Sequence, residues 1–116
     1  MNNENTFEEM FAEFLRIYKF VNHSKILEAL NNELDDNSNN KKKIYELSDG
    51  NRSTRDIQKI VGVSPPTITA YWKQWSLAGI VIPAERKGRY KAAFDLKEYG
   101  LSVLEEIDQG DELECK

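Results

Sequence analysis

The sequence of 116 residues predicts a mostly helical fold of the α+β class, in which two short helices joined by a tight turn precede a two-stranded hairpin. Apolar residues recur at helical spacing across residues 53–79, and two strand-like runs enclose the segment 84–89. Similar helical spacing near both ends of the chain predicts flanking N- and C-terminal helices. The predicted regions are N-terminal helices at 1–40, a central unit at 41–95, and a C-terminal helix with an acidic tail at 96–116.

The first helix of the central unit is expected to begin after Ser53. The Ser53 hydroxyl can accept an N–H of the first turn, and Asp56 can accept the Ser53 N–H, which makes a capping box. The apolar face of this helix consists of Ile57, Ile60 and Val61. Gly62 can then adopt the positive φ that turns the chain.

The second helix is expected to follow Ser64, with Pro65 at the first helical position, where its missing N–H does no harm. Steps of four, three and four residues predict one buried stripe, formed by Ile68, Trp72, Trp75 and Gly79. Polar and small residues lie away from that stripe: Thr67, Thr69, Ala70, Lys73, Gln74 and Ser76. This helix should therefore have an exposed polar side.

A helix at about 41–48 is expected to add Ile44 and Leu47 to the same core. Downstream, residues 80–82 and 90–94 predict the two strands of a hairpin. Gly88 allows the bend, and four cations surround it: Arg86, Lys87, Arg89 and Lys91. A hairpin with this charge matches nucleic-acid phosphates or a minor groove.

These segments resemble the winged helix-turn-helix transcription regulators of bacteria and archaea, in the broad sense that includes the MarR-like and ArsR-like families. The resemblance covers roughly residues 41–107. It rests on Ser-Thr-Arg-Asp-Ile at 53–57, Val-Gly-Val-Ser at 61–64, Thr-Ile-Thr-Ala-Tyr-Trp-Lys-Gln-Trp-Ser-Leu-Ala-Gly-Ile-Val at 67–81, Gly-Arg-Tyr at 88–90 and Phe-Asp-Leu-Lys-Glu-Tyr-Gly-Leu at 94–101. Trp72 and Trp75 stand where such proteins usually carry core leucines, so both indoles are expected to pack inward.

The resemblance implies a sequence-specific, double-stranded DNA-binding transcriptional regulator that acts as a homodimer. Its recognition helix, at about 64–78, would enter the major groove, and its wing, 84–91, would contact phosphates or the minor groove. The implied contacts of the recognition helix are Ser64, Pro65, Pro66, Thr67, Thr69, Ala70, Lys73 and Gln74. Those of the preceding helix and the wing are Ser53, Thr54, Arg55, Arg86, Lys87, Arg89 and Lys91.

The recognition helix departs from the family pattern in two respects. Thr69 and Ala70 occupy a stretch where related helices often carry Arg, which leaves Lys73 as the only cation of this helix. Pro65 and Pro66 remove two N–H groups that would otherwise face phosphate. Their rings and the threonine methyl groups could contact thymine methyl groups instead. We therefore predict a preference for A·T-rich sites.

The distribution of charge supports the same segment as the nucleic-acid contact. The net charge of the chain is −4, which taken alone argues against binding an anionic duplex. Residues 41–95, however, carry eleven basic and five acidic side chains, a net of +6, whereas residues 1–40 and 96–116 each carry a net of −5. The positive charge is therefore concentrated in the central unit, although such blocks of charge are also common on plain solvated surfaces.

An N-terminal helix capped by Asn5 or Thr6 is expected to carry an apolar seam with steps of four, three, four and three residues: Phe7, Phe11, Phe14, Tyr18 and Val21. We interpret this seam as the dimer interface; the alternative is a core helix that packs within the protomer. A C-terminal helix capped by Asp95 is expected to pair with the N-terminal helix across a two-fold axis. Its apolar residues are Leu96, Tyr99, Val103, Leu104 and Ile107.

The sequence predicts a break at residues 22–24, a short second helix, and a polar loop at 35–40. The apolar residues of that second helix are Ile26, Leu27, Leu30 and Leu34. The lysine run 41–43 is either a phosphate contact or a helix start on the surface, and the sequence favours neither.

No catalytic group of residues is expected. His23 is the single histidine and Cys115 the single cysteine, with no nucleophile or metal-ligand spacing around either. We therefore expect no enzymatic activity, cofactor or metal, no membrane segment or signal peptide, and a cytoplasmic protein. A protein-interaction module in a transcription or chromatin assembly is the alternative function. A small apolar effector bound between the N-terminal aromatics and the central unit also stays open, beside an ordinary core.

Overall fold

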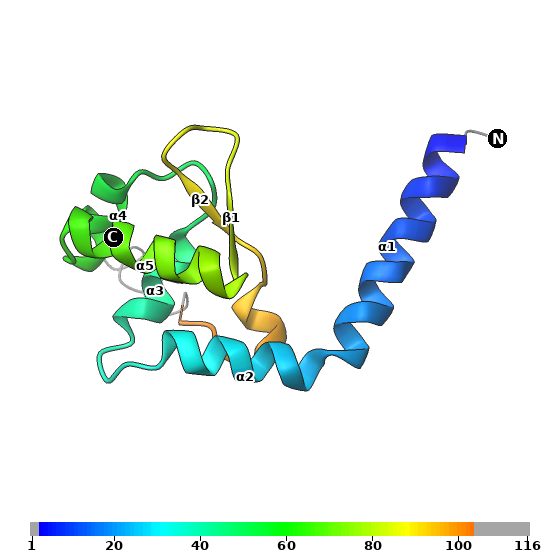
Figure 1. Cartoon of the computed structure of the whole chain (residues 1–116), viewed down its shortest axis with the longest axis horizontal. Coiled ribbons are helices and arrows are strands. Elements are labelled where there is room, and N and C mark those ends of the chain that lie inside the picture. Colours follow the sequence, from blue (N-terminus) through cyan, green and yellow to red (C-terminus); the bar gives the residue numbers. More distant parts are fainter. Residues whose placement is uncertain (1–2, 104–116) are drawn as a thin grey trace, which may run out of the picture.

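The structure, a computed structural model, describes residues 3–103 (Figure 1). Within that range the chain is mostly helical and carries one small two-stranded antiparallel sheet, as predicted for the fold class. The elements in chain order are α1 (Asn3–Val21), α2 (His23–Leu34), α3 (Asn40–Leu47), α4 (Thr54–Val61), α5 (Pro65–Ala78), β1 (Val81–Pro83), β2 (Tyr90–Ala92) and the 3₁₀ helix η1 (Leu96–Tyr99). The turn between α4 and α5, the hairpin after α5 and the break at Asn22 all lie where the sequence predicts them.

The sheet pairs β1 with β2 in an antiparallel register that places Ile82 opposite Lys91. On its other side β2 meets the segment that follows α3, where the Ala92 N–H donates to the Ser48 carbonyl at 2.8 Å. The backbone of β2 is therefore held both by β1 and by the connection between α3 and α4. This double attachment fixes the direction in which the hairpin leaves the core.

One hydrophobic core joins α2, α3, α4, α5, β1 and η1. Its buried residues are Ile26, Leu30, Leu34, Ile44, Tyr45, Leu47, Ile57, Ile68, Trp72, Trp75, Ile80, Val81, Leu96 and Tyr99. Trp72 and Trp75 are each 1% exposed, which confirms that the indoles pack inward. Three of the core residues come from α2, so the core extends across the predicted limit at residue 40. The short helix α2 therefore packs with the central unit, in addition to its contact with α1.

The buried side of α4 is narrower than predicted. Ile57 is fully buried, but Ile60 is 47% exposed and Val61 only half-buried. Because successive residues of a helix are about 100° apart, Ile60 and Val61 lie to either side of Ile57. In this helix of eight residues, Ile57 is the fully buried contact and Val61 packs against the core beside it. Ile60, which the sequence placed on the same apolar face, does not pack inward.

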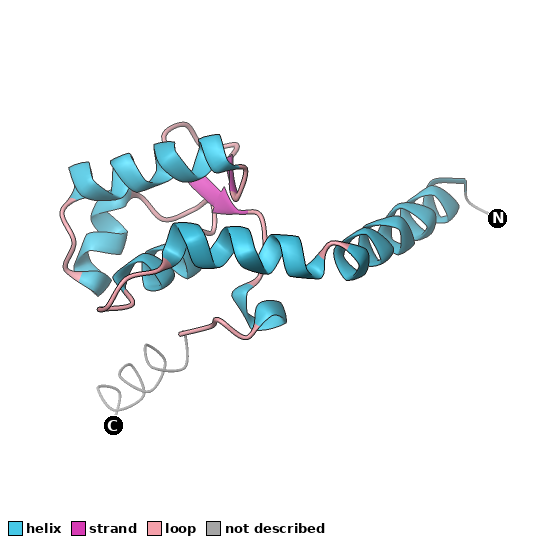
Figure 2. Cartoon of the chain, turned by 60° about the horizontal axis from the view of Figure 1, so that its bottom comes forward, coloured by secondary structure: helices cyan, strands magenta, loops and turns pink. Residues whose placement is uncertain are grey.

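Helix α1 leaves the rest of the molecule as an arm (Figures 1 and 2). It meets the core only near its C-terminal end, where Asn22 separates it from α2. The side chains of the predicted seam are between 52% and 72% exposed: Phe7, Phe11, Phe14, Tyr18 and Val21. The alternative in which these residues belong to the protomer's own core is therefore wrong for the described chain.

The predicted C-terminal helix is wrong for residues 100–103, which are not helical. Asp95 caps a turn as predicted, since its carboxylate accepts the Lys97 N–H at 3.0 Å. Gly100 then adopts a φ of 71° and the Leu101 N–H donates back to the Leu96 carbonyl at 3.0 Å, a bond pattern that ends a helix. Leu96 and Tyr99 are buried in the protomer's core and cannot pair with a second copy. The predicted helix positions 104 and 107 lie outside the described residues.

None of the helices within residues 3–103 has the length and apolar character that crossing a lipid bilayer requires.

Candidate nucleic-acid interface

The candidate interface consists of α4, α5 and the β1–β2 hairpin, and it begins with a capping box at α4. The Asp56 N–H donates to the Ser53 hydroxyl at 3.2 Å, and the Ser53 N–H donates to the Asp56 carboxylate at 2.9 Å, as predicted. The hydrogen bond from the Ser53 backbone lowers the pKa of Asp56 below its usual value. Gly62 ends the helix with a φ of 81°, so the turn between α4 and α5 is set by these local signals.

Helix α5 is anchored by its buried stripe. It starts at Pro65 and ends before Gly79, whose φ is 84°, and Ile68, Trp72 and Trp75 are buried along it. The Trp75 ring meets Tyr45 of α3 edge-on, with ring centroids 5.7 Å apart. Because its two largest side chains are locked in the core, α5 presents its opposite side in a fixed orientation.

Tyr45 connects this core to the base of the hairpin. Its hydroxyl donates to the Ile80 carbonyl at 2.8 Å and accepts the Phe94 N–H at 3.1 Å. Burial raises the pKa of Tyr45 to about 12, so the hydroxyl stays protonated and keeps donating. The residues just before β1 and just after β2 are therefore held by one side chain.

We define the exposed α5 face as Pro66, Thr69, Ala70 and Lys73, all of which are exposed. Ser64, Pro65 and Thr67 flank it at the start of the helix, where the hydroxyls of Ser64 and Thr67 are 2.9 Å apart and hydrogen-bonded. The tip of the helix therefore presents proline rings, methyl groups and two mutually bonded hydroxyls. Lys73 brings the one cation of α5 to this face.

Gln74, which the sequence places with the base-reading residues, points toward α2. Its amide nitrogen lies 3.3 and 3.4 Å from the two carboxylate oxygens of Glu33. A side chain that donates to a carboxylate on the neighbouring helix must break that bond before it can reach a base. The sequence contains no local signal for this contact, because the two residues are far apart along the chain.

The hairpin carries its four predicted cations in two different roles. Arg86 and Lys87 are exposed at the tip, and Lys91 is exposed on β2. Arg89 is half-buried, and its Nε donates to the Asn51 carbonyl at 3.0 Å. Arg89 therefore ties the hairpin to the loop after α3, and sequence reasoning missed this structural role.

The remaining predicted contacts lie at the start of α4. The Ser53 hydroxyl is occupied by the capping box, whereas Thr54 is half-buried and Arg55 is exposed. Sequence reasoning also missed Arg52, whose guanidinium lies 3.1 Å from the Asp49 carboxylate. Burial raises the pKa of Asp49, but hydrogen bonds from the Asn51 and Arg52 N–H groups outweigh it and leave that pKa below its usual value.

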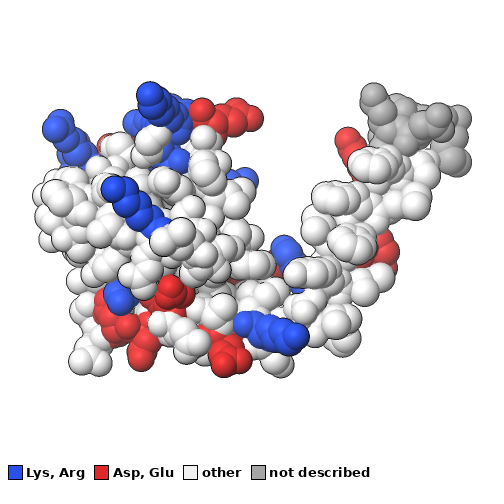
Figure 3. All heavy atoms as spheres, viewed as in Figure 1, with Lys and Arg blue, Asp and Glu red and all other residues white. Residues whose placement is uncertain are grey.

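The charges of the molecule are unevenly distributed. In Figure 3, Lys and Arg side chains are most numerous over α4, α5 and the hairpin, where an acidic group also lies, whereas acidic side chains are most numerous along the opposite edge, near α2, where Lys and Arg side chains are also present. Within the predicted lysine run, Lys41 lies over the Tyr71 ring at 5.4 Å from its centroid, so part of that run packs against α5. The surface that combines the exposed α5 face and the hairpin tip is therefore predominantly cationic.

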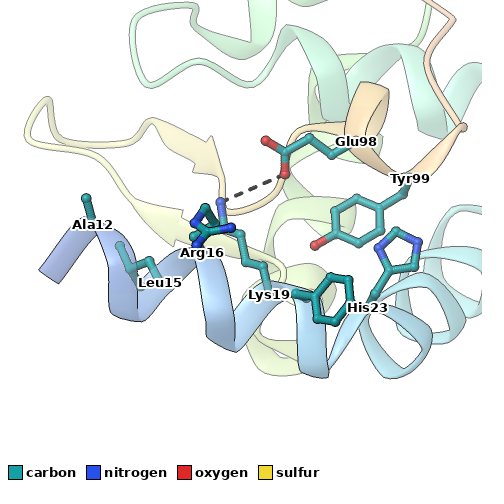
Figure 4. A pocket seen from close by; sticks show the side chains of 8 residues that line it. Ala12, Leu15, Arg16, Lys19, His23, Glu98 and Tyr99 are labelled. Atoms are coloured by element: carbon teal, nitrogen blue, oxygen red, sulfur yellow. Dashed lines mark ion pairs between the residues drawn. The ribbon is translucent and has the colours of Figure 1, made fainter. Parts of the chain in front are cut away.

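A pocket of about 460 Å³ lies elsewhere, between α1 and η1 (Figure 4). The Lys19 ammonium is 4.0 Å from the Glu98 carboxylate across it, and the rings of His23 and Tyr99 stack beside it at 4.8 Å. Charged and apolar side chains line it together, unlike the apolar effector site that the sequence left open. Among residues 3–103, no three His, Cys, Asp or Glu side chains are grouped so that they could hold a metal ion.

Comparison of the chain with models of known protein families, with curated protein sequences and with solved structures finds no match. The functional interpretation therefore depends on the geometry described above.

Proposed function

We propose that this chain binds double-stranded DNA as a winged helix-turn-helix protein. In this proposal α4 and α5 form the helix-turn-helix, α5 enters the major groove, and the β1–β2 hairpin is the wing that contacts phosphates or the minor groove. The observation that carries the proposal is the exposed α5 face, held in a fixed orientation by Trp72 and Trp75 and followed directly by a hairpin with a cationic tip.

The two parts of this surface would contribute differently to binding. Arg86 and Lys87 are long, exposed cations, and contacts of that kind to phosphate give affinity without sequence preference. Thr69, Ala70 and Lys73 lie on a helix face that can approach base edges. We therefore assign sequence discrimination to the exposed α5 face and electrostatic attraction to the hairpin.

The composition of the α5 tip supports a preference for A·T-rich sites. Pro65 and Pro66 have no N–H, and the hydroxyls of Ser64 and Thr67 are hydrogen-bonded to each other. The start of α5 therefore presents few free hydrogen-bond donors to a phosphate. Methyl and ring carbons can instead contact the thymine methyl group in the major groove. Together with the resemblance noted above, these features support a regulator of transcription.

A titration of labelled duplex DNA by fluorescence anisotropy tests the proposal. The duplexes would be sequences selected from a random library and a scrambled control, each measured at about 50 and 200 mM salt. We expect preferential binding to the selected sequence and a marked loss of affinity at the higher salt concentration. The selected sequences should be rich in A·T, and enrichment of G·C-rich sequences would refute that preference.

Substitutions on the exposed α5 face locate the site. Lys73→Ala and Thr69→Ala should each weaken binding to the selected sequence about tenfold or more and reduce the preference over the scrambled duplex. Lys25→Ala is the matched control, because Lys25 is also an exposed helical lysine but lies on α2. If the α5 variants bind as tightly as the Lys25 variant, the α5 face is not the contact and a protein-interaction role becomes the better interpretation.

A further inference from the structure

Five exposed cations of the candidate interface have no acidic partner within the described chain. We call them the interface cations: Arg55 of α4, Lys73 of α5, and Arg86, Lys87 and Lys91 of the hairpin. Within residues 3–103, none of them takes part in an ion pair of 4.0 Å or less, whereas Arg16, Lys19 and Arg52 each do. A surface with several such charges attracts an anionic group of matching extent.

The chain also contains an anionic group of that kind. Residues 104–116, which follow the described part of the chain, carry six acidic side chains and one basic side chain, a net of −5. We call residues 104–116 the acidic segment. Its acids form two groups of three: Glu105, Glu106 and Asp108, then Asp111, Glu112 and Glu114. Blocks of like charge often serve to contact a surface of opposite charge.

The acidic segment starts from a fixed point on α3. The Ser102 hydroxyl donates to the Glu46 carboxylate at 2.9 Å, and the Val103 N–H donates to the same carboxylate. Leu101 packs against the core. A pocket of about 360 Å³ is lined by Glu46 together with Lys91, so the last described residues lie on the side of α3 that adjoins the hairpin. The acidic segment therefore begins close to one of the interface cations.

The acidic segment is long enough to reach the other interface cations. An extended chain advances about 3.3 Å per residue, so Asp111 can lie up to about 26 Å from Val103, and Glu114 up to about 36 Å. The two shorter dimensions of the whole molecule are 32 and 29 Å. The second group of acids is therefore within reach of Lys73 and the tip of the hairpin.

From these observations we propose that the acidic segment binds the interface cations of its own chain and competes with DNA for them. The cations concerned are those of the proposed DNA-binding function, on which this inference rests. The carboxylates take the place of phosphates: the group that includes Asp108 lies at Lys91, and the group after Gly110 lies at Lys73 and the hairpin tip. Because the segment is part of the chain, its effective concentration is on the order of millimolar. Weak contacts therefore lower the apparent affinity for every duplex.

Occupation of the surface differs from long-range repulsion between DNA and any acidic part of the chain. At about 0.1 M salt the Debye length is about 10 Å, so acids that lie away from the surface are largely screened. Glu8 and Glu9 on the arm and Glu28 on α2 are exposed acids of this kind. Neutralising acids of the segment should therefore change DNA affinity more than neutralising an equal number of these.

The anisotropy titration tests the competition with the triple variant Asp111→Asn, Glu112→Gln and Glu114→Gln. At about 50 mM salt we expect it to bind the selected and the scrambled duplex about threefold or more tightly than the natural chain, and the difference should shrink at about 200 mM. The matched control is Glu8→Gln with Glu9→Gln and Glu28→Gln. It loses the same charge and should change affinity by less than about twofold. Equal gains for the two variants, or no gain for the first, would refute the proposal.

A nitroxide label on Cys115, the single cysteine, tests the contact within the chain without DNA. In the NMR spectrum, the amide signals of Lys73, Lys87 and Gly88 should be broadened by the label, whereas that of Glu28 should not. The broadened signals should recover at about 500 mM salt and in the triple variant. Broadening confined to α2 would refute the proposal. So would broadening that arises only from a labelled second copy, in a mixture of labelled and unlabelled chains.

The two measurements distinguish failure of this proposal from failure of the proposed function. A chain that binds duplex DNA but shows no broadening at Lys73 and Lys87 refutes a role for the acidic segment and leaves the proposed function in place. A chain that shows this broadening but binds no duplex refutes the proposed function and, with it, the competition. Broadening that disappears when duplex DNA is added supports both.

Discussion

The indole N–H of Trp72 donates to the hydroxyl of Ser48 at 2.9 Å, and both side chains are buried. The same hydroxyl donates to the Ile44 carbonyl at 2.7 Å, so Ser48 links the middle of α5 to the last turn of α3. Trp72 also meets the Tyr90 ring of β2, with centroids 5.4 Å apart. One tryptophan therefore sets the position of α5 relative to both α3 and the hairpin.

Removal of the Ser48 hydroxyl should destabilise the fold. Ser48→Ala leaves the buried indole N–H of Trp72 without its acceptor, and an unsatisfied buried donor costs about 1–3 kcal/mol. Urea unfolding should show this loss with an unchanged slope. In Trp72→Phe the same serine change should cost less, because the donor is gone. Ser24→Ala, on the exposed side of α2, is the control and should change stability by less than about 0.5 kcal/mol.

The capping box of α4 should make stability depend on acid pH. The folded state lowers the pKa of Asp56 because the Ser53 N–H binds the carboxylate. A lowered pKa adds stability above the unfolded value, 3.8, and this stability is lost as the pH falls through the lower folded value. Chemical unfolding between neutral and acid pH should show a smaller decline for Asp56→Asn than for the natural chain. An identical decline for the two chains would mean that Asp56 does not contribute.

Gly50 and Gly62 form a matched pair for testing close packing. Both have positive φ values, 85° and 81°, so alanine at either position adopts a strained backbone that costs about 1–2 kcal/mol. A Cβ at Gly50 would also lie 3.2 Å from the Ala84 Cβ, whereas nothing lies within 4 Å of one at Gly62. Gly50→Ala should therefore lower the thermal midpoint more than Gly62→Ala. Equal losses would show that Ala84 moves aside without cost.

The exposed cations of the hairpin should control the salt dependence of DNA binding. The double variant Arg86→Ala with Lys87→Ala should lower affinity for all duplexes alike. It should also reduce the slope of log affinity against log salt by about 0.9 for each phosphate that the variant no longer neutralises. The anisotropy titration described above measures both quantities. Arg89 is left unchanged because it holds Asn51, and its removal would also disturb the hairpin. A weaker preference for the selected sequence would instead assign base contacts to the wing.

The sequence predicted best the elements whose ends are set by neighbouring residues. Ser53 with Asp56, Pro65 and Gly62 are local signals, and all were confirmed. Gly79 was predicted as part of the buried stripe of α5, but this prediction is wrong, because Gly79 is exposed and ends the helix with a positive φ. The predicted C-terminal helix failed at a local signal that was given too little weight, since Gly100 is a common helix terminator and costs about 1 kcal/mol inside a helix. The predicted helix continued past Gly100 only because apolar residues recur at helical spacing on both sides of it.

The contacts that sequence reasoning missed join residues distant in the chain. Gln74 with Glu33 and Arg89 with Asn51 depend on how α5 and the hairpin pack, and side-chain spacing cannot predict which partner a long polar residue finds. The same holds for α2, whose apolar residues predicted a helix but not the unit with which it packs. For the candidate site, the sequence identified the exposed residues of α5 and the cations of the hairpin tip. It could not show that Gln74 and Arg89 are engaged in hydrogen bonds within the fold.

Asn22, the single residue between α1 and α2, controls the direction of the long helix α1. A helix of 19 residues is about 28 Å long, so a rotation of about 10° at Asn22 would displace its far end by about 5 Å. Asn22 is held by hydrogen bonds from its N–H and its side-chain amide to the Tyr18 carbonyl, at 3.0 and 2.9 Å. This one joint therefore sets the direction in which α1 carries its exposed aromatic side chains relative to α5 and the hairpin.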